Sequence, residues 1–272
     1  MQAILTVTIP FFALVLLGYL AAQRQWMPES AIPGLNAYVL YYALPCMLFR
    51  FGSSMPFARL IDPLLIALYT TCALLMIAIT IAVTLRRGSG PAGVDLKDAA
   101  FGALVAAFPN AGFMGVPLLV ALLGANAAGP VIGAILVDLI LTSTLCLALA
   151  QSSSHRSGGG DERSMLAAAA LSLRGALTNP LPWAITVGAL FAALDRELPG
   201  PIAEIVRMLG ESAAPVALFT IGAVLSRAGR HGHTKTPPRN YLPVALLKLI
   251  VHPALIFGIG AGAAALGAPV ST

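Results

Sequence analysis

Long apolar stretches separated by short polar loops run along the whole chain. A membrane-spanning helix needs about 20 mostly apolar residues. With a window of about that length, eight apolar segments stand out, near 4–22, 33–51, 63–85, 98–123, 130–150, 179–194, 201–226 and 241–266. The pattern therefore predicts an all-α integral membrane protein with eight spans.

The fourth segment, 98–123, is interrupted by Pro109, Asn110, Gly112, Gly115 and Pro117. Proline removes a helical N–H and crowds the carbonyl four residues before it. Irregular backbone at membrane depth is tolerated only where it is buried in protein or lines a cavity. We therefore expect two half-helices with a short joint, as in transporters that hold a substrate at the membrane midplane. The alternative is a proline-kinked structural span, which has no need of a polar amide at this depth.

A polar insertion divides the chain. Gln151–Arg163 is rich in Ser and Gly and is typical of a flexible linker, while Met165–Leu177 is amphipathic and predicts an interfacial helix. We therefore expect a first repeat of five spans over residues 1–150 and a cytoplasmic linker with an interfacial helix over 151–178. A second repeat follows over 179–272.

The two halves share prolines and glycines at matched positions. A shift of 170 residues pairs Pro10 with Pro180, Gly18 with Gly188, Pro45 with Pro215, Phe49 with Phe219 and Gly52 with Gly222. Matched Pro and Gly positions carry backbone meaning. The repeats start five spans apart, an odd number, so the copies are inverted in the membrane, as in many secondary transporters. Only three of the five spans of the second repeat precede Thr272, and we expect a ninth and a tenth span to follow in a longer chain.

Composition supports the membrane assignment. Hydrophobic residues make up 58% and charged residues 10% of the 272 positions, against about 45–50% and about 25% in soluble domains. No soluble catalytic domain is left over, so we do not expect an enzyme. Cys46, Cys72 and Cys146 fall inside apolar runs without ligand spacing, so we expect neither a disulfide framework, nor a metal site, nor a cofactor.

The basic residues are distributed unequally between the two sets of loops. With the N-terminus outside, eleven Lys and Arg residues fall on inner loops and three on outer ones, which is the positive-inside pattern. We therefore expect a multi-pass protein of the bacterial cytoplasmic (inner) membrane with its N-terminus outside. The first apolar stretch lacks the basic start of a cleaved signal peptide. The net charge of +5 suits an anionic inner leaflet and does not indicate nucleic acid.

The string Pro109-Asn110-Ala111-Gly112-Phe113-Met114-Gly115-Val116-Pro117-Leu118-Leu119 resembles the crossover motif of the auxin efflux carrier family, the bacterial relatives of plant PIN-FORMED transporters. Asn179-Pro180, the stretch Ala214–Phe219, and Lys248-Leu249 with Pro253 are also similar to that family. The resemblance implies ten spans in two inverted five-span repeats, with crossed broken helices and a moving transport domain. It also implies carriage of small organic anions, auxin in plants and dicarboxylates such as malate or malonate in bacteria.

At the joint, the second half-helix presents unpaired N–H groups and the positive end of its dipole, which attract a carboxylate. Asn110 can donate its amide to the same carboxylate, and the resemblance implies that it is the crossover Asn. Gly112 and Gly115 allow backbone to approach a ligand closely, although close helix packing explains them equally well. With the flanking Pro109 and Pro117, these residues form the predicted substrate site.

Three ionisable residues lie in later spans, where charge is expensive. Asp138 is in the fifth span, and Lys248 and His252 are four residues apart on one face of the eighth. Asp138 or His252 is a candidate site for a coupling proton, with Lys248 as a counter-charge. Alternatively, Lys248 extends to the membrane edge and His252 bonds a carbonyl.

These features predict a secondary active transporter of a small organic anion, working by alternating access and coupled to protons or the membrane potential. One alternative is a sodium–proton exchanger or sodium-coupled anion symporter of related fold, although such exchangers typically place adjacent acidic residues at the crossing and Asp138 stands alone. Another is a non-transporting membrane sensor or scaffold, for which only short loops are available as an output domain. The expected partners are the substrate anion and the bilayer, and a homodimer is left open.

Overall fold

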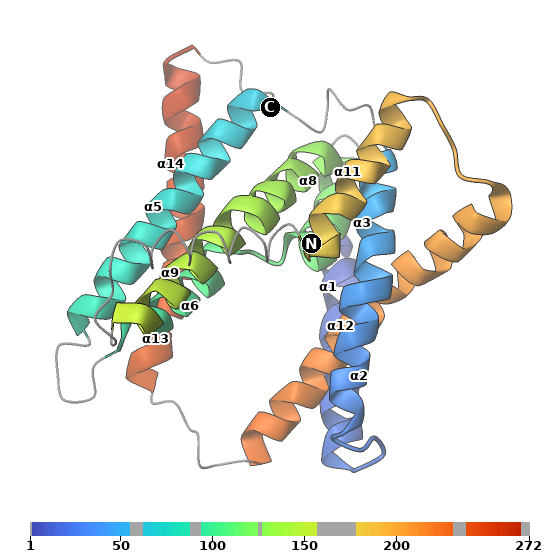
Figure 1. Cartoon of the computed structure of the whole chain (residues 1–272), viewed down its shortest axis with the longest axis horizontal. Coiled ribbons are helices and arrows are strands. Elements are labelled where there is room, and N and C mark those ends of the chain that lie inside the picture. The colour runs from blue at the N-terminus through green and yellow to red at the C-terminus, as the bar shows by residue number, and fades with distance from the viewer. Residues whose placement is uncertain are drawn as a thin grey trace. The chain divides into compact units, whose positions relative to one another are not determined.

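In the computed structural model, the described residues are 2–54, 62–87, 94–124, 127–156, 178–230 and 238–267, and within these ranges the regular structure is entirely helical. Figure 1 shows the described helices, several of which are joined by short π-helical segments. This confirms the prediction of an all-α protein. The expected interfacial helix at Met165–Leu177 lies outside the described residues.

Six of the described helices are long and apolar enough to cross a membrane. They are Ile4–Gln23, Ala31–Ser53, Pro63–Arg86, Ala128–Gln151, Gly200–Arg230 and Asn240–Ala265. The other two predicted spans are also present, but one is interrupted and the other is shorter than these six helices. One is the broken segment around Pro109, and the other is the short apolar helix Pro180–Ala193.

The helices form two compact units, which are described separately. Unit 1 comprises Met1–Ile61, Asn110–Ile132 and Pro180–Lys235, and unit 2 comprises Asp62–Pro109, Gly133–Asn179 and Thr236–Thr272. Each unit therefore takes helices from both halves of the sequence. Unit 1 contains α1 (Gln2–Gln23), α2 (Ala31–Tyr38), η1 (Val39–Ala43), α3 (Leu44–Ser53), η2 (Ala111–Gly115), α7 (Val116–Leu123), α11 (Pro180–Ala193) and α12 (Gly200–Arg230). Unit 2 contains α5 (Pro63–Arg87), α6 (Leu96–Ala107), η4 (Asp138–Thr142), α9 (Ser143–Arg156), α13 (Pro238–Leu246), η6 (Leu247–Val251) and α14 (His252–Ala265). α8 (Ala128–Val137) is divided between the units, its first half in unit 1 and its second half in unit 2.

In unit 1, α1 and α12 touch through glycines. A Cβ built on Gly18 of α1 would overlap the backbone carbonyl of Phe219, and one built on Gly222 of α12 would overlap the carbonyl of Val15. Only a residue without a side chain allows the two backbones to approach this closely. These two glycines therefore fix where the helices cross.

The pair formed by α3 and α11 makes the same kind of contact. A Cβ on Gly188 of α11 would overlap the carbonyl of Phe49, and one on Gly52 of α3 would overlap the carbonyl of Ile185. The shift of 170 residues that aligns the two halves maps each residue of the first contact onto its counterpart here. The same helix pairing thus occurs twice in unit 1, at positions 170 residues apart.

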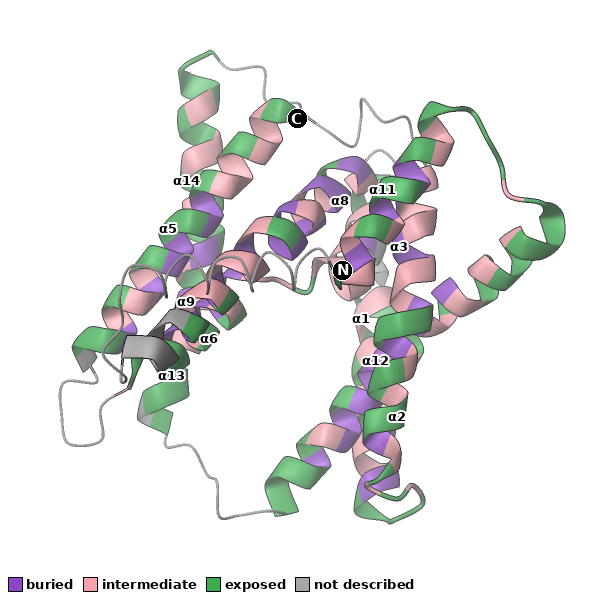
Figure 2. Cartoon of the chain, viewed as in Figure 1, coloured by how far each residue is buried: buried purple, intermediate pink, exposed green. Residues whose placement is uncertain are grey.

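Unit 2 is built around an alanine-rich face of α6. Its alanines at 99, 100, 103, 106 and 107 are buried (Figure 2), and several of them pack with Cys72 and Met76 of α5 and Cys146 of α9. The helix begins at Asp95, whose side chain accepts a hydrogen bond of 2.8 Å from the Asp98 N–H. A carboxylate in this position satisfies one of the free amides of the first turn.

Of the four π segments among the described residues, three (η1, η2 and η6) are each followed by a proline after one intervening residue. Pro45, Pro117 and Pro253 each occupy the second position of the α-helix that follows. Proline cannot donate to the carbonyl four residues before it and its ring crowds that carbonyl. A wider turn relieves this conflict without breaking the helix.

Candidate functional site

The broken segment consists of two half-helices and a three-residue joint, as predicted. α6 ends at Ala107, and the Phe108 N–H donates the last helical hydrogen bond, 3.0 Å to the Leu104 carbonyl. Phe108 itself is extended, with φ −91° and ψ 100°. η2 and α7 then run on from Ala111, so the joint is residues 108–110.

The second half-helix begins at Asn110. Its backbone carbonyl accepts hydrogen bonds from the N–H groups of Met114 (3.2 Å) and Gly115 (3.1 Å). The three amides that precede Met114 lie before the first bond of this helix, which is where a helix offers free donors and the positive end of its dipole. The Asn110 side chain is exposed. This end of the break therefore offers hydrogen-bond donors for an anion.

The first half-helix is capped by Lys248 of η6. In a continuous helix the Val105 carbonyl would accept from the N–H of residue 109, but Pro109 has none. Lys248 takes its place, since its ammonium donates to the carbonyl of Val105 at 2.7 Å and to that of Phe108 at 2.9 Å. A cation at a helix C-terminus also interacts favourably with the helix dipole.

His252 lies one turn after Lys248 and contacts the same end of α6. Its side chain is buried, and the imidazole is hydrogen-bonded to the backbone of Ala106. The other ring nitrogen, Nε2, has no partner among the described residues. Both members of the pair at 248 and 252 thus hold carbonyl groups that the break in the helix leaves free.

Asp138 is fully buried at the start of η4. Its Oδ2 accepts a hydrogen bond of 2.7 Å from the Tyr69 hydroxyl on α5, and its Oδ1 accepts one of 3.0 Å from the Thr142 hydroxyl. Among the described residues it forms no ion pair within 4.0 Å. Sequence analysis singled out Asp138 but not its two hydroxyl partners, which lie on α5 and one turn later on the same helix.

The structure divides the predicted substrate residues between the two units. Pro109 is in unit 2, whereas Asn110, Gly112, Gly115 and Pro117 are in unit 1. A Cβ at Gly115 would lie at ordinary van der Waals distances, 3.6 Å from its nearest neighbour. A small residue is therefore accommodated there, and close packing does not demand glycine. All three coupling candidates belong to unit 2.

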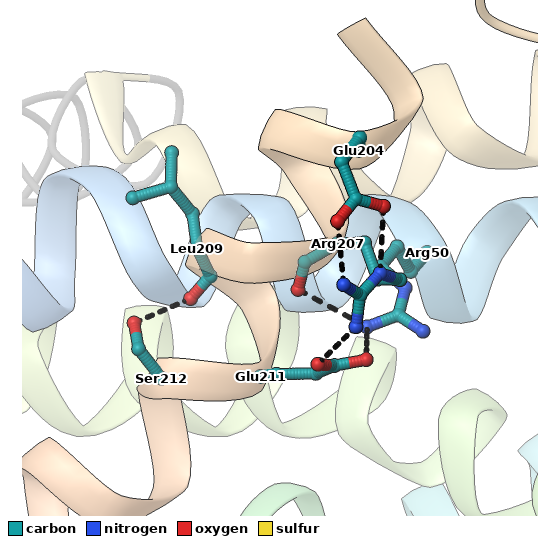
Figure 3. A network of polar contacts seen from close by, with 6 residues as sticks. All are labelled: Arg50, Glu204, Arg207, Leu209, Glu211 and Ser212. Atoms are coloured by element: carbon teal, nitrogen blue, oxygen red, sulfur yellow. Dashed lines mark hydrogen bonds and ion pairs between the residues drawn. The ribbon is translucent and has the colours of Figure 1, made fainter. Parts of the chain in front are cut away.

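A second polar cluster lies in unit 1 and is self-neutralised (Figure 3). Arg207 donates to Glu204 at 2.8 Å and to Glu211 at 2.6 Å, both on its own helix α12. Arg50 of α3 reaches the Arg207 carbonyl and Glu211, each at 3.4 Å. The four side chains are 40–52% exposed. Because every cation here already has a carboxylate partner, the cluster links α3 to α12 and offers no free charge to an anion.

In the described ranges, no group of three or more His, Cys, Asp or Glu side chains is placed to hold a metal ion. The cysteines of those ranges are free, with Cys72 and Cys146 buried in the core of unit 2.

The chain is similar in sequence to known membrane proteins. A family model described as "Membrane transport protein" matches residues 3–270. A protein of Rhizobium meliloti (strain 1021) named "Putative malonate transporter" is 29% identical over 94% of this chain and 76% of its own length. A protein of Escherichia coli (strain K12) named "Uncharacterized transporter YfdV" is 24% identical over 80% of this chain and 67% of its own length. These matches confirm the resemblance to the auxin efflux carrier family.

Proposed function

We propose that this chain, which belongs to the membrane transport protein family, carries a small organic carboxylate anion by alternating access. Its family membership makes it a transporter and not an enzyme. The relative named for malonate supports a short dicarboxylate as the first substrate to test. We further propose that the protein lies in the bacterial cytoplasmic membrane with its N-terminus outside, as the loop charges indicate.

The observation that carries this proposal is the chemical difference between the two ends of the broken helix. The carbonyl end, α6, is already satisfied by Lys248 and His252. The amide end, at Asn110, has free N–H groups and an exposed side-chain amide. A carboxylate is an acceptor-only group, so the second end suits it and the first does not. The helix dipole favours the same choice.

Alternating access needs parts that can move as bodies. The two units each have their own packed helices, which supports a mechanism in which one unit moves and the bound anion is exposed to each side in turn. The break lies where the chain passes from one unit to the other, between Pro109 and Asn110. Movement of either unit would therefore act on the joint. A proton gradient or the membrane potential would drive the cycle.

The test is equilibrium binding of malonate to the purified full-length protein, comparing wild type with Asn110→Ala. We expect the variant to bind at least about tenfold more weakly, which corresponds to the loss of one charge-assisted hydrogen bond of about 1.5 kcal/mol. Asn36→Ala is the matched control, because Asn36 is an exposed amide of α2 in the same unit. If a folded Asn110→Ala variant keeps wild-type affinity, Asn110 is not part of the site.

A further inference from the structure

Resting on the transport function proposed above, we infer that Asp138, Tyr69 and Thr142 form a proton-binding site that couples transport to the proton gradient, with Tyr69 as the group that connects the buried carboxyl to water. Asp138 binds the proton, and the two hydroxyls position it. The inference stands on the hydrogen-bond geometry, the burial and the surroundings of this carboxyl group.

The two hydroxyl partners fit both protonation states of Asp138. A hydroxyl is a donor and an acceptor, whereas a carboxylate only accepts. In the charged state both hydroxyls donate, one to each carboxylate oxygen, at 2.7 Å and 3.0 Å. In the neutral state the carboxyl O–H donates to one of the two hydroxyl oxygens. That hydroxyl then directs its own O–H away from the carboxyl. An ammonium or guanidinium partner, which cannot accept, would favour only the charged state.

The surroundings of Asp138 raise the free energy of its charged state but do not exclude that state. Asp138 has no exposed surface. Burial of an unpaired carboxylate away from water costs on the order of several kcal/mol. Among the described residues, the other titratable groups that act on it electrostatically are Tyr69 and Cys72 of α5 and Lys248 of η6. Lys248 is already bonded to two carbonyls of α6. The face of α6 in the unit 2 core is made of alanines.

Tyr69 provides the route for the proton. Asp138 is inaccessible, whereas Tyr69 is half-buried, so its ring reaches from the carboxyl to the surface of unit 2. The Tyr69 hydroxyl gives its proton to Oδ2 of Asp138 and takes one from a hydronium ion, which becomes water. The net change is one O–H bond formed on the carboxyl and one broken in hydronium, while the tyrosine O–H is restored. Release on the other side of the membrane is the reverse step.

The site is poorly suited to a metal cation as the coupling ion. The side chains offer it the Asp138 carboxylate and two hydroxyls, whereas hard cations such as Ca²⁺ and Mg²⁺ take about six or more oxygen ligands. Four side-chain oxygens joined by two hydrogen bonds suit one proton. The chemistry therefore favours H⁺ over a hard divalent cation at this position.

The first arm of the test needs no substrate. The infrared absorption of protonated carboxyl groups is followed in the purified full chain from about pH 2 to about pH 9, a range that includes the ordinary titration of Asp and extends well above it. We expect Asp138→Asn to remove one titrating carboxyl signal and Tyr69→Phe to change the pH at which that signal is lost. Tyr41→Phe is the matched control, because it removes the hydroxyl of an exposed tyrosine in unit 1, and it leaves the signal unchanged. An unchanged signal in Asp138→Asn overturns the inference.

The second arm measures proton movement with a pH-sensitive dye inside proteoliposomes when labelled malonate is added. Wild type moves protons with malonate, and Asp138→Asn exchanges malonate across the membrane but moves at least about tenfold fewer protons. Malonate movement without protons in wild type, or movement that requires Na⁺, overturns the inference while the transport proposal stands. A titrating Asp138 without any malonate binding or movement contradicts the proposed substrate class and leaves the proton site in place.

Discussion

Gly188 of α11 lies directly against the backbone carbonyl of Phe49 in α3, and the residues 170 positions apart from them, Gly18 and Phe219, make the same contact between α1 and α12. The two contacts use different helices and the same chemistry. Each places a Cα against a carbonyl in a space that a methyl group would overfill. Matched glycines in the sequence thus mark matched helix crossings in unit 1.

We predict that Gly18→Ala and Gly188→Ala destabilise the protein by similar amounts, about 1–3 kcal/mol, because overpacking of a tight contact costs that much. Thermal unfolding in detergent, followed by the loss of monodisperse protein, measures the effect. Gly34→Ala is the control, since a Cβ at Gly34 of α2 meets nothing within 4 Å, and alanine is the better helix former. A large loss at one of the two positions without the other would show that the crossings are not equivalent.

We predict energetic coupling between Pro109 and Lys248. Lys248→Met removes the donor to the carbonyls of Val105 and Phe108 and should cost about 1.5–3 kcal/mol, the usual contribution of a hydrogen bond to a charged group. Pro109→Ala restores an N–H that can bond the Val105 carbonyl, so the same Lys248 substitution should cost less in that background. A double-mutant cycle on the free energy of unfolding should give an interaction of at least about 0.5 kcal/mol.

Strict additivity of the two substitutions would contradict this account of Lys248 as a helix cap. His252→Leu offers an independent check, since it removes the imidazole that is hydrogen-bonded to the backbone of Ala106 and puts an apolar side chain in its place. It should also destabilise α6, and it should do so to a similar extent whether residue 109 is proline or alanine.

The ion-pair cluster around Arg207 should contribute little to stability. All of its side chains are 40–52% exposed, and exposed ion pairs are weak and screened by salt. Arg207→Gln should lower the unfolding temperature by less than Gly18→Ala does, and the difference from wild type should vanish at high salt. A loss as large as that of the glycine variant, or one that salt does not reduce, would mean that Arg207 has a role beyond linking α3 to α12.

Loop charge makes a topological prediction. Single cysteines at Ser153, near the end of α9, and at Thr234, in a background without the three native cysteines, should resist an impermeant thiol reagent in intact cells, because both positions belong to the positively charged inner set of segments. Labelling after permeabilisation shows that each cysteine is reactive. Labelling of both from outside would invert the proposed orientation.

The broken helix was predictable from the sequence because its cause is local. Pro109 cannot donate, and polar residues at this depth need a reason, so the joint was found within a few residues of its position. The all-helical fold followed from the lengths of the apolar runs in the same way. Both conclusions depend on residues that are close together in the chain.

The partners of the ionisable residues could not be predicted, since they come from helices far away in the sequence. Tyr69 precedes Asp138 by 69 residues, and Lys248 follows Val105 by 143. No periodicity within one span indicates which face meets which neighbour. Pro109 alone indicates that the carbonyl four residues before it must find another donor. That Lys248 is this donor follows only from the fold.

The π segments have a consequence for how relatives of this chain are aligned. The segments η1, η4 and η6, which have α-helix on both sides, each accommodate a single additional residue within a continuous helix, and one residue corresponds to a rotation of about 100° around the helix axis. A one-residue deletion in Val39–Ala43 or Asp138–Thr142 would therefore leave the span intact and turn everything beyond it to a new face. Gaps of one position inside a span should be interpreted as changes of register, by which a relative could present a different side chain to its substrate without any substitution.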